Sequence, residues 1–152
     1  MTPRSSLDPV PTDDSRRRVI ELDIPNDVRY IERVVERVQR ECQAMAYGPR
    51  QVMLNVAVAL TEALSNAILR GNADDPSKHV HVRAIIDANR LIVEVRDEGV
   101  GFDLDACTVD VGVDTVERED GRGLFLMRNL MDRVECESAR RGNTVRLTLN
   151  RT

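Results

Sequence analysis

Five stretches of the chain alternate apolar and polar residues, and this period of two predicts β-strands. They cover 18–24, 80–86, 91–97, about 133–138 and 145–149. The short connection 87–90 makes a hairpin of the second and third strands, and Arg141-Gly142-Asn143 joins the last two. Strands joined by short connections favour a sheet in which most neighbours run antiparallel.

Three other stretches carry apolar residues at helical spacing. The first, 27–46, is amphipathic and follows Asn26, a residue type that often caps helices. The second, 49–70, is apolar almost all round, which indicates a buried helix, and 121–131 predicts a short third helix. This order of elements predicts an α+β fold. We expect a two-layer sandwich with helices on one face of a mixed, mostly antiparallel β-sheet.

The chain of 152 residues has the length of one domain. Residues 1–15 hold three prolines among small polar residues and predict a disordered N-terminal tail, which leaves 16–152 as the folded domain. No apolar stretch approaches the about 20 residues that cross a membrane. The first residues also lack the apolar segment of a secretory signal. We therefore expect a cytoplasmic protein without membrane contact.

Charge and composition exclude two further classes. The net charge of -4 and an aromatic content of 3% do not suit a protein that binds nucleic acid directly. Cys42, Cys107 and Cys136 are widely spaced and form no CxxC pair, so we expect no disulfide framework. His79 and His81 alternate along a predicted strand with no cysteine nearby, which disfavours a zinc site.

A polar stripe runs along the otherwise apolar second helix. At about 100° per residue, Asn55, Glu62, Asn66 and Arg70 fall within roughly 80° of one another. Ala59 lies on the same stripe and leaves room beside it. Glu62 and Asn66 are one turn apart, close enough to act on one ligand. Three interpretations stay open here: a ligand-binding face, the solvent-facing edge of an ordinary helix, or an internal pair between Glu62 and Arg70.

A glycine-rich segment begins where the third strand ends, with the sequence Asp97-Glu-Gly99-Val-Gly101-Phe. Its glycines permit unusual backbone angles and the close approach of a ligand, and Asp97 could accept hydrogen bonds from that ligand. A simple turn would carry the same residues. The surrounding segment 98–120 is rich in Gly and Asp and is long for a loop, as binding lids often are.

A second glycine pair, in Gly121-Arg122-Gly123-Leu124, opens the last predicted helix. Free N–H groups and the helix dipole at such a terminus suit phosphate. Alone, this pattern is weak, but the P-loop signature is absent from the sequence.

The three segments occur in the order E-x-x-x-N on a helix, D-x-G-x-G after a strand and G-x-G at a helix start. Together they resemble the N box, G1 box and G2 box of the GHKL ATPase superfamily over roughly 18–150. The two N-terminal helices and the run GRGLFLMRNLMDRVE are most similar to one branch, the bacterial anti-sigma factor serine/threonine kinases.

The resemblance implies binding of ATP with Mg²⁺. Asn66 would bind the magnesium, Glu62 would act as the general base, and Asp97 would accept the adenine amino group. A threonine on a late strand commonly supports the adenine through water in this family, and Thr144 matches it. The remaining expected nucleotide contacts are the glycines of the two boxes and their neighbours: Gly99, Gly101, Gly121, Arg122, Gly123 and Leu124.

Two features depart from the family pattern. The family often has a histidine where this chain has Arg70, which could contact phosphate or pair with Glu62 and weaken it as a base. The expected lid is also acidic just before the second glycine pair, at Glu117, Glu119 and Asp120. These carboxylates would repel a triphosphate unless a metal or arginine compensates.

The resemblance implies three partners: a sigma factor that the protein sequesters, a small anti-sigma antagonist that it phosphorylates on serine, and a second copy bound through the first strand and helix. A nucleotide-binding interaction module with little or no phosphotransfer is the alternative function. A third possible function is that of an ATPase fragment that serves a larger assembly.

Overall fold

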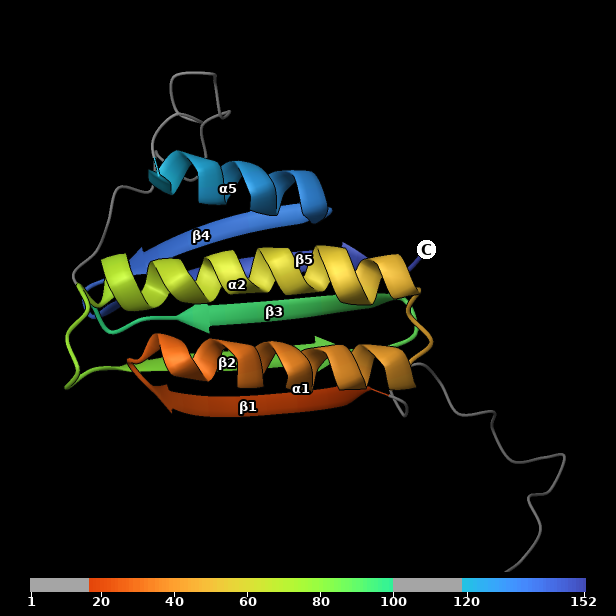
Figure 1. Ribbon diagram of the computed structural model, residues 1–152, viewed down its shortest axis with the longest axis horizontal. Helices are drawn as coiled ribbons and strands as arrows, with labels where there is room; N and C mark the ends of the chain where they lie inside the picture. Colours follow the sequence, from red (N-terminus) through yellow and green to blue (C-terminus); the bar gives the residue numbers. More distant parts are fainter. Residues whose placement is uncertain (1–16, 100–118) are drawn as a thin grey trace, which may run out of the picture.

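The computed structural model describes residues 17–99 and 119–152. The expected tail over 1–15 and most of the expected loop over 98–120 lie outside the described residues. The described chain forms one sheet with its helices packed against one face (Figure 1). The predicted α+β two-layer fold is therefore confirmed.

Five strands make up the sheet: β1 (Arg18–Pro25), β2 (His79–Ile86), β3 (Arg90–Arg96), β4 (Arg133–Ala139) and β5 (Gly142–Asn150). Their order across the sheet is β1-β2-β3-β5-β4, and each neighbouring pair runs antiparallel. Within the described residues the sheet is thus wholly antiparallel, where the sequence suggested a mixed one. Gly142 pairs with Ala139, so Gly142 and Asn143 belong to β5 and not to the connection.

The helical segments are η2 (Val28–Tyr30), α1 (Ile31–Ala44), η3 (Gln51–Val56), α2 (Ala57–Asn66), η4 (Ala67–Gly71) and α5 (Glu119–Leu130). The three consecutive segments η3, α2 and η4 form one continuous rod with π-helical turns at both ends. The first helical segment is capped by Asp27, whose carboxylate accepts the Arg29 N–H at 2.9 Å. The expected cap, Asn26, is instead a buried residue with other partners.

The core lies between the helices and one face of the sheet (Figure 1). Every second residue of β2 from Val80 to Ile86 is buried, and the residues between them face the other side. Val34 and Val38 of α1 and Leu60 and Leu64 of α2 fill the space above them. The period-two and helical patterns of the sequence therefore meet in a single apolar layer.

By length and composition, the rod Gln51–Gly71 is the one helix among the described residues that could cross a membrane. No span was expected from the sequence, because no uninterrupted apolar stretch approaches the about 20 residues that cross a membrane. Such a helix is weak evidence for a span, since the core helix of a globular domain passes the same test. Here it packs against α1 and α5, and 44% of its apolar window is buried.

The cysteines differ from expectation. Cys42 at the end of α1 is a free, fully buried thiol, and desolvation raises its pKa to about 12. Cys136 on β4 is disulfide-bonded. The sequence argued against a disulfide framework and did not point to this single disulfide.

Candidate functional site

A glycine of α5 lies against the polar stripe of the second helix. A Cβ at Gly123 would stand 2.9 Å from Glu62 Oε2 and 3.3 Å from Asn66 Nδ2. Both of these side chains are half-buried. Further along the stripe, Asn55 donates from Nδ2 to the Leu130 carbonyl at 2.6 Å and fixes the other end of α5. Asn55, Glu62 and Asn66 of the stripe therefore face α5, whereas Arg70 is exposed.

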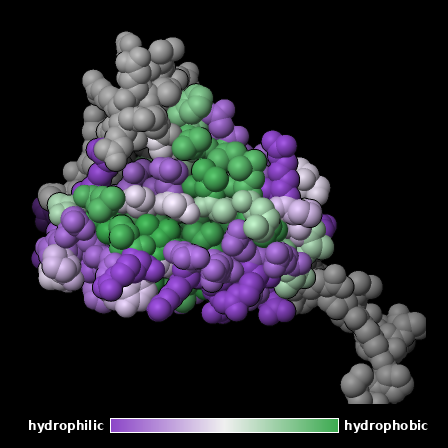
Figure 2. Space-filling view, in the orientation of Figure 1, coloured by the Kyte–Doolittle hydropathy of each residue, from purple (hydrophilic) through white to green (hydrophobic). Residues whose placement is uncertain are grey.

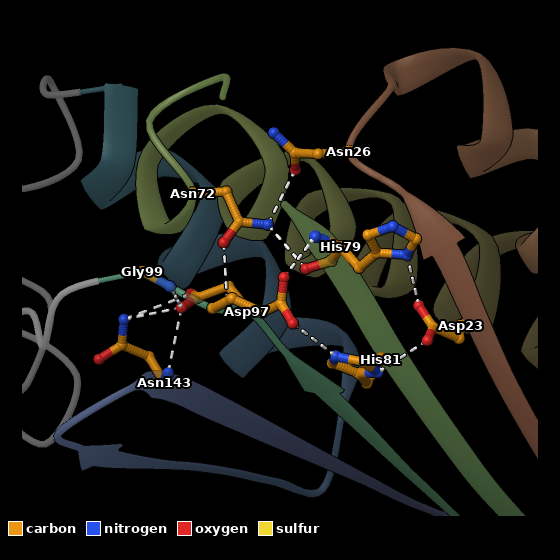
Figure 3. Close-up of polar contacts among 9 residues, drawn as sticks. Asp23, Asn26, Asn72, His79, His81, Asp97, Gly99 and Asn143 are labelled. Atoms are coloured by element: carbon orange, nitrogen blue, oxygen red, sulfur yellow. Dashed lines mark hydrogen bonds and ion pairs between the residues drawn. The ribbon is translucent and has the colours of Figure 1, made fainter. Parts of the chain in front are cut away.

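Asp97 directly follows β3 and is only 3% exposed. Its Oδ1 accepts three hydrogen bonds, from Gly99 N at 2.9 Å, from Asn143 N at 3.1 Å and from Asn143 Nδ2 at 3.0 Å (Figure 3). Oδ2 accepts a longer bond from the same Nδ2 at 3.3 Å. A buried carboxylate requires such donors, because an unpaired buried charge is costly. These bonds hold the carboxylate in one orientation.

Three glycines from separate elements crowd around Asp97. A Cβ at Gly71, the last residue of η4, would overlap the Asp97 carboxylate. A Cβ at Gly99 would overlap the carbonyl oxygen of Gly71. Gly142 at the start of β5 has a φ of +138°, and a Cβ there would overlap the Asp97 carbonyl. Only residues without a side chain allow these backbones to meet around Asp97.

Asn72, directly after η4, is fully buried and ties three segments together (Figure 3). Its Nδ2 donates to Asn26 Oδ1 at 3.0 Å and to the His79 carbonyl at 2.9 Å. Its Oδ1 accepts the Glu98 N–H at 2.7 Å. Asn72 therefore holds the backbone next to Asp97 against the end of β1 and the start of β2.

Glu98 is anchored on β2. Its Oε1 accepts the His79 N–H at 2.7 Å, and its Oε2 contacts His81 Nε2 at 3.2 Å. The hydrogen bond from His79, followed by that from His81, holds the pKa of Glu98 below its usual value of 4.5. A lowered pKa means that this contact stabilises the fold above about pH 4.5, and that the contribution is lost as pH falls through the folded-state pKa.

Replacing Glu98 with glutamine should remove this acid-dependent part of the stability, because glutamine keeps the shape but does not titrate. Thermal unfolding at several values between pH 7 and about pH 3.5 measures it. The variant should melt below the wild type at pH 7, and the difference should shrink as pH falls. Glu36→Gln, the same change on an exposed position of α1, should show no such trend. A difference that is constant with pH would contradict the role of Glu98.

Thr144 does not lie with Asp97. Successive strand residues point to opposite faces of a sheet, and Asn143 is the β5 residue whose side chain reaches the Asp97 carboxylate. Thr144 pairs with Arg96 and, together with His81, helps to line a hollow of about 560 Å³ on the sheet face away from the helices. Asn143, and not Thr144, is therefore the β5 residue that bonds the Asp97 carboxylate, and the support of an adenine by Thr144 stays a prediction.

The sequence profile of the histidine kinase-like ATPase domain matches residues 24–149, which include every element around Asp97 and Glu62. The chain belongs to this family. Serine-protein kinase RsbW of Bacillus velezensis is 33% identical over 135 residues, covering 85% of this chain and 83% of that protein. The anti-sigma F factor of Bacillus cytotoxicus is 33% identical over 99 residues, covering 63% of this chain and 68% of that protein. Within the histidine kinase-like ATPases, the chain falls in the anti-sigma factor serine kinase branch.

A solved structure shares the fold. The crystal structure of the SiaB–SiaC complex from Pseudomonas aeruginosa contains a chain that matches with a TM-score of 0.67 and 14% identity. The match covers 89% of this chain and 92% of that chain. At this identity the similarity concerns the architecture alone, and it supports the open antiparallel sheet with helices on one face.

The residues of the family's second glycine box fall on α5. Gly121, Arg122, Gly123 and Leu124 all belong to this helix, which begins two residues before the expected start. Gly123 is buried against the N box, and Leu124 packs against the core. The side chain of Arg122, like all of Gly101, lies outside the described residues.

Arg70 lies on η4 and is exposed. Arg70 takes part in an interaction within the protein. Its pairing with Glu62 stays a prediction. Histidine kinase-like ATPases that carry histidine at this position would place a shorter, titratable group there.

Three residues of the site were missed from the sequence. From the sequence, Gly71 and Asn72 were interpreted only as the residues that stop the second helix, and Asn143 was assigned to a connection. Gly142 is the signal that could have pointed to Asn143, because a glycine opening a late strand often marks close approach of another backbone. No local pattern distinguishes Asn72 from an ordinary loop asparagine.

Proposed function

We propose that this protein binds Mg-ATP along the rod η3–α2–η4 and transfers the γ-phosphoryl group to a serine of a small antagonist protein. We propose that it also sequesters a sigma factor. The observation that carries the proposal is that one rod contacts both candidate ends of a nucleotide. Glu62 and Asn66 face Gly123 at one point, and Gly71 touches the Asp97 carboxylate at another.

The spacing along the rod supports this assignment. Glu62 and Gly71 are nine residues apart, which corresponds to roughly 13 Å at 1.5 Å per residue. That separation suits a base at Asp97 and a γ-phosphate at Glu62. The chain between them is helical throughout, so the distance between the two ends is fixed by the backbone.

The oxygen ligands near Glu62 and Asn66, where the phosphates are proposed to bind, fit a magnesium ion. Mg²⁺ usually takes one or two protein oxygens and completes its shell with water and phosphate oxygens. No group of three or more metal-ligating side chains is found in the described part of the chain, and such a site does not require one. Asn66 would supply its amide oxygen. When bound, the ion would neutralise charge on the phosphates.

Glu62 is the group that would handle the proton. Its half-buried carboxylate can accept the hydroxyl proton as the serine oxygen attacks the γ-phosphorus. The bond from the γ-phosphorus to the oxygen bridging it to the β-phosphorus then breaks, and ADP leaves. Phosphoryl transfer depends mostly on the positioning of the reactants and the stabilisation of charge. One oriented carboxylate is therefore sufficient to accept the proton.

Calorimetry with Asp97→Asn tests the nucleotide site. The change turns an acceptor-only carboxylate into an amide and should weaken ATP binding roughly 10- to 150-fold, the worth of one charge-assisted hydrogen bond. Asp74→Asn is the matched control, because Asp74 is exposed and follows the same rod. Equal ATP affinity in Asp97→Asn and the control would remove Asp97 from the site.

The partners rest on the relatives, whose names are serine-protein kinase and anti-sigma F factor. Large exposed apolar residues on η3 and α5 support a protein-binding role, and Figure 2 shows apolar surface over the helices. These residues are Met53, Leu54, Phe125 and Leu126. Homodimerisation through β1 and α1 stays a prediction. Wild-type protein that binds ATP and a partner but transfers no phosphate would favour the interaction-module alternative.

A further inference from the structure

We propose that the acceptor protein docks lengthwise on the solvent-facing side of the rod η3–α2–η4, with its serine at Glu62 and uncharged, mostly apolar surface on both sides of that serine. The inference rests on the proposed function, since it concerns the partner that the same site would phosphorylate. It assigns this surface to the phosphate acceptor and not to the sequestered sigma factor.

One exposed side of the rod carries no charged residue. Its positions follow one another at spacings of four, three, four and four residues, which places them on one side of a helix. We refer to this side as the ridge, and its residues are Leu54, Val58, Thr61, Ser65 and Leu69. Leu54 is 37% exposed and Leu69 is 44% exposed, so apolar surface meets solvent at both ends of the ridge.

The neighbouring helix α1 has a different exposed side. Most of its solvent-facing residues are charged: Glu32, Arg33, Glu36, Arg37 and Arg40. Figure 2 shows polar surface over α1 and apolar surface over the helices beside it. An uncharged and partly apolar exposed side is typical of a surface that another molecule covers.

The candidate catalytic residue lies beside the middle of the ridge. Glu62 directly follows Thr61 and comes one turn after Val58. At 1.5 Å per residue, Leu54 is about 12 Å from Glu62 along the rod in one direction, and Leu69 is about 10 Å from it in the other. A molecule that covers both leucines therefore also covers Glu62.

Leu126 of α5 widens the apolar surface next to Glu62. It comes three residues after Gly123, the glycine that lies against Glu62, and so it shares the side of α5 that adjoins the rod. Leu126 is 37% exposed. Apolar side chains therefore border Glu62 both along the rod and on the helix packed against it.

This position selects the occupant. The acceptor protein must bring its serine oxygen to Glu62 and must therefore lie on the ridge. A partner that is held without being phosphorylated has no need to cover Glu62, and it would block transfer to any other protein if it did. Because the ridge is uncharged, a charged group docked on it would lose hydration without gaining a partner. The matching surface of the acceptor is therefore apolar or carries neutral polar groups.

Steady-state phosphoryl transfer tests the inference, and the acceptor is the antagonist protein that the wild type labels from γ-labelled ATP. Leu54→Gln and Leu69→Gln place a polar side chain with good helix propensity at each end of the ridge. Each variant should raise the KM for the antagonist about tenfold, as expected for an interface hot spot. The kcat and the affinity for ATP should stay within about twofold of the wild type.

The double variant and a control sharpen the comparison. The two leucines lie about 22 Å apart along the rod, so their effects should add and the double variant should raise KM about 100-fold. Val28→Gln is the matched control, because Val28 is 48% exposed and lies on η2 instead of the rod. Its KM should stay within about twofold of the wild type. All of these variants should melt within about 2 °C of the wild type, since the changed side chains are exposed.

An unchanged KM in the double variant would overturn the inference, and companion measurements would then show what the ridge does instead. Loss of sigma-factor binding would assign the ridge to that partner, and loss of a dimer in sedimentation would assign it to a second copy. A lower melting temperature would assign it to packing within the chain. Failure of the proposed function looks different, because the wild type would then label no acceptor and both proposals would fall.

Discussion

Replacing Glu62 with glutamine is expected to slow phosphoryl transfer about 10²–10⁴-fold while ATP affinity stays within about twofold, the usual effect of losing a general base without losing binding. Glutamine has the shape of glutamate but cannot take the serine proton. The side chain should still fit beside Gly123, because glutamine is nearly the same size as glutamate. The assay follows labelled γ-phosphate into a cognate antagonist protein.

Glu36→Gln makes the same chemical change on the exposed side of α1 and should transfer phosphate at the wild-type rate. Asn66→Ala should behave differently from Glu62→Gln, with weaker Mg-ATP binding and loss of transfer together, because Asn66 is the proposed magnesium ligand. A wild-type protein as slow as Glu62→Gln would falsify the kinase proposal and leave the nucleotide site intact.

Replacing Gly71 with alanine is expected to lower ATP affinity roughly 100-fold, because the new methyl group displaces the Asp97 carboxylate and its acceptor is lost. The displaced carboxylate also loses its bonds to Asn143 and Gly99, so unfolding free energy should fall by about 1–3 kcal/mol, as for other overpacked sites. Calorimetry with ATP and chemical denaturation measure the two effects separately.

Gly48→Ala is the matched control, because a Cβ at Gly48 has no neighbour within 4 Å. That variant should bind ATP as the wild type does. If Gly71→Ala lost stability but kept ATP affinity, the contact between Gly71 and Asp97 would be a packing contact only. If it lost neither, alanine would be tolerated and the geometry around Asp97 would need revision.

The elements of this fold follow closely from the sequence, because burial repeats with a period of two in strands and near 3.6 in helices. β2 and β3 bury every second residue as the alternation predicts. The rod from Gln51 to Gly71 is less buried than its apolar composition implies, because Met53, Leu54 and Leu69 are exposed. The N-box pair Glu62 and Asn66 could also be proposed from the sequence, because polar residues on an apolar helix require a partner.

The remainder of the site depends on contacts between segments far apart in the chain. Whether Asn143 or Thr144 faces Asp97 is decided by the register of β5 against β3, and a shift of one residue exchanges the two faces. The first residues of β5 have a turn-like composition, so the strand was predicted to begin three residues later. Asn72 and Gly71 acquire their roles only when β1, β2 and the end of β3 converge on the end of the rod.

This convergence means that no local piece of the chain can form the surroundings of Asp97 on its own. Asp97 follows the hairpin β2–β3, Asn143 belongs to the hairpin β4–β5, and Gly71 comes from the rod that precedes both. Pairing of β3 with β5 joins the two hairpins and carries the entropy cost of a non-local contact. A nucleotide bound around Asp97 would stabilise the folded state, because it binds only the state in which both hairpins are joined. The nucleotide concentration would then determine the resistance of the chain to proteolysis as well as the rate of the proposed phosphoryl transfer.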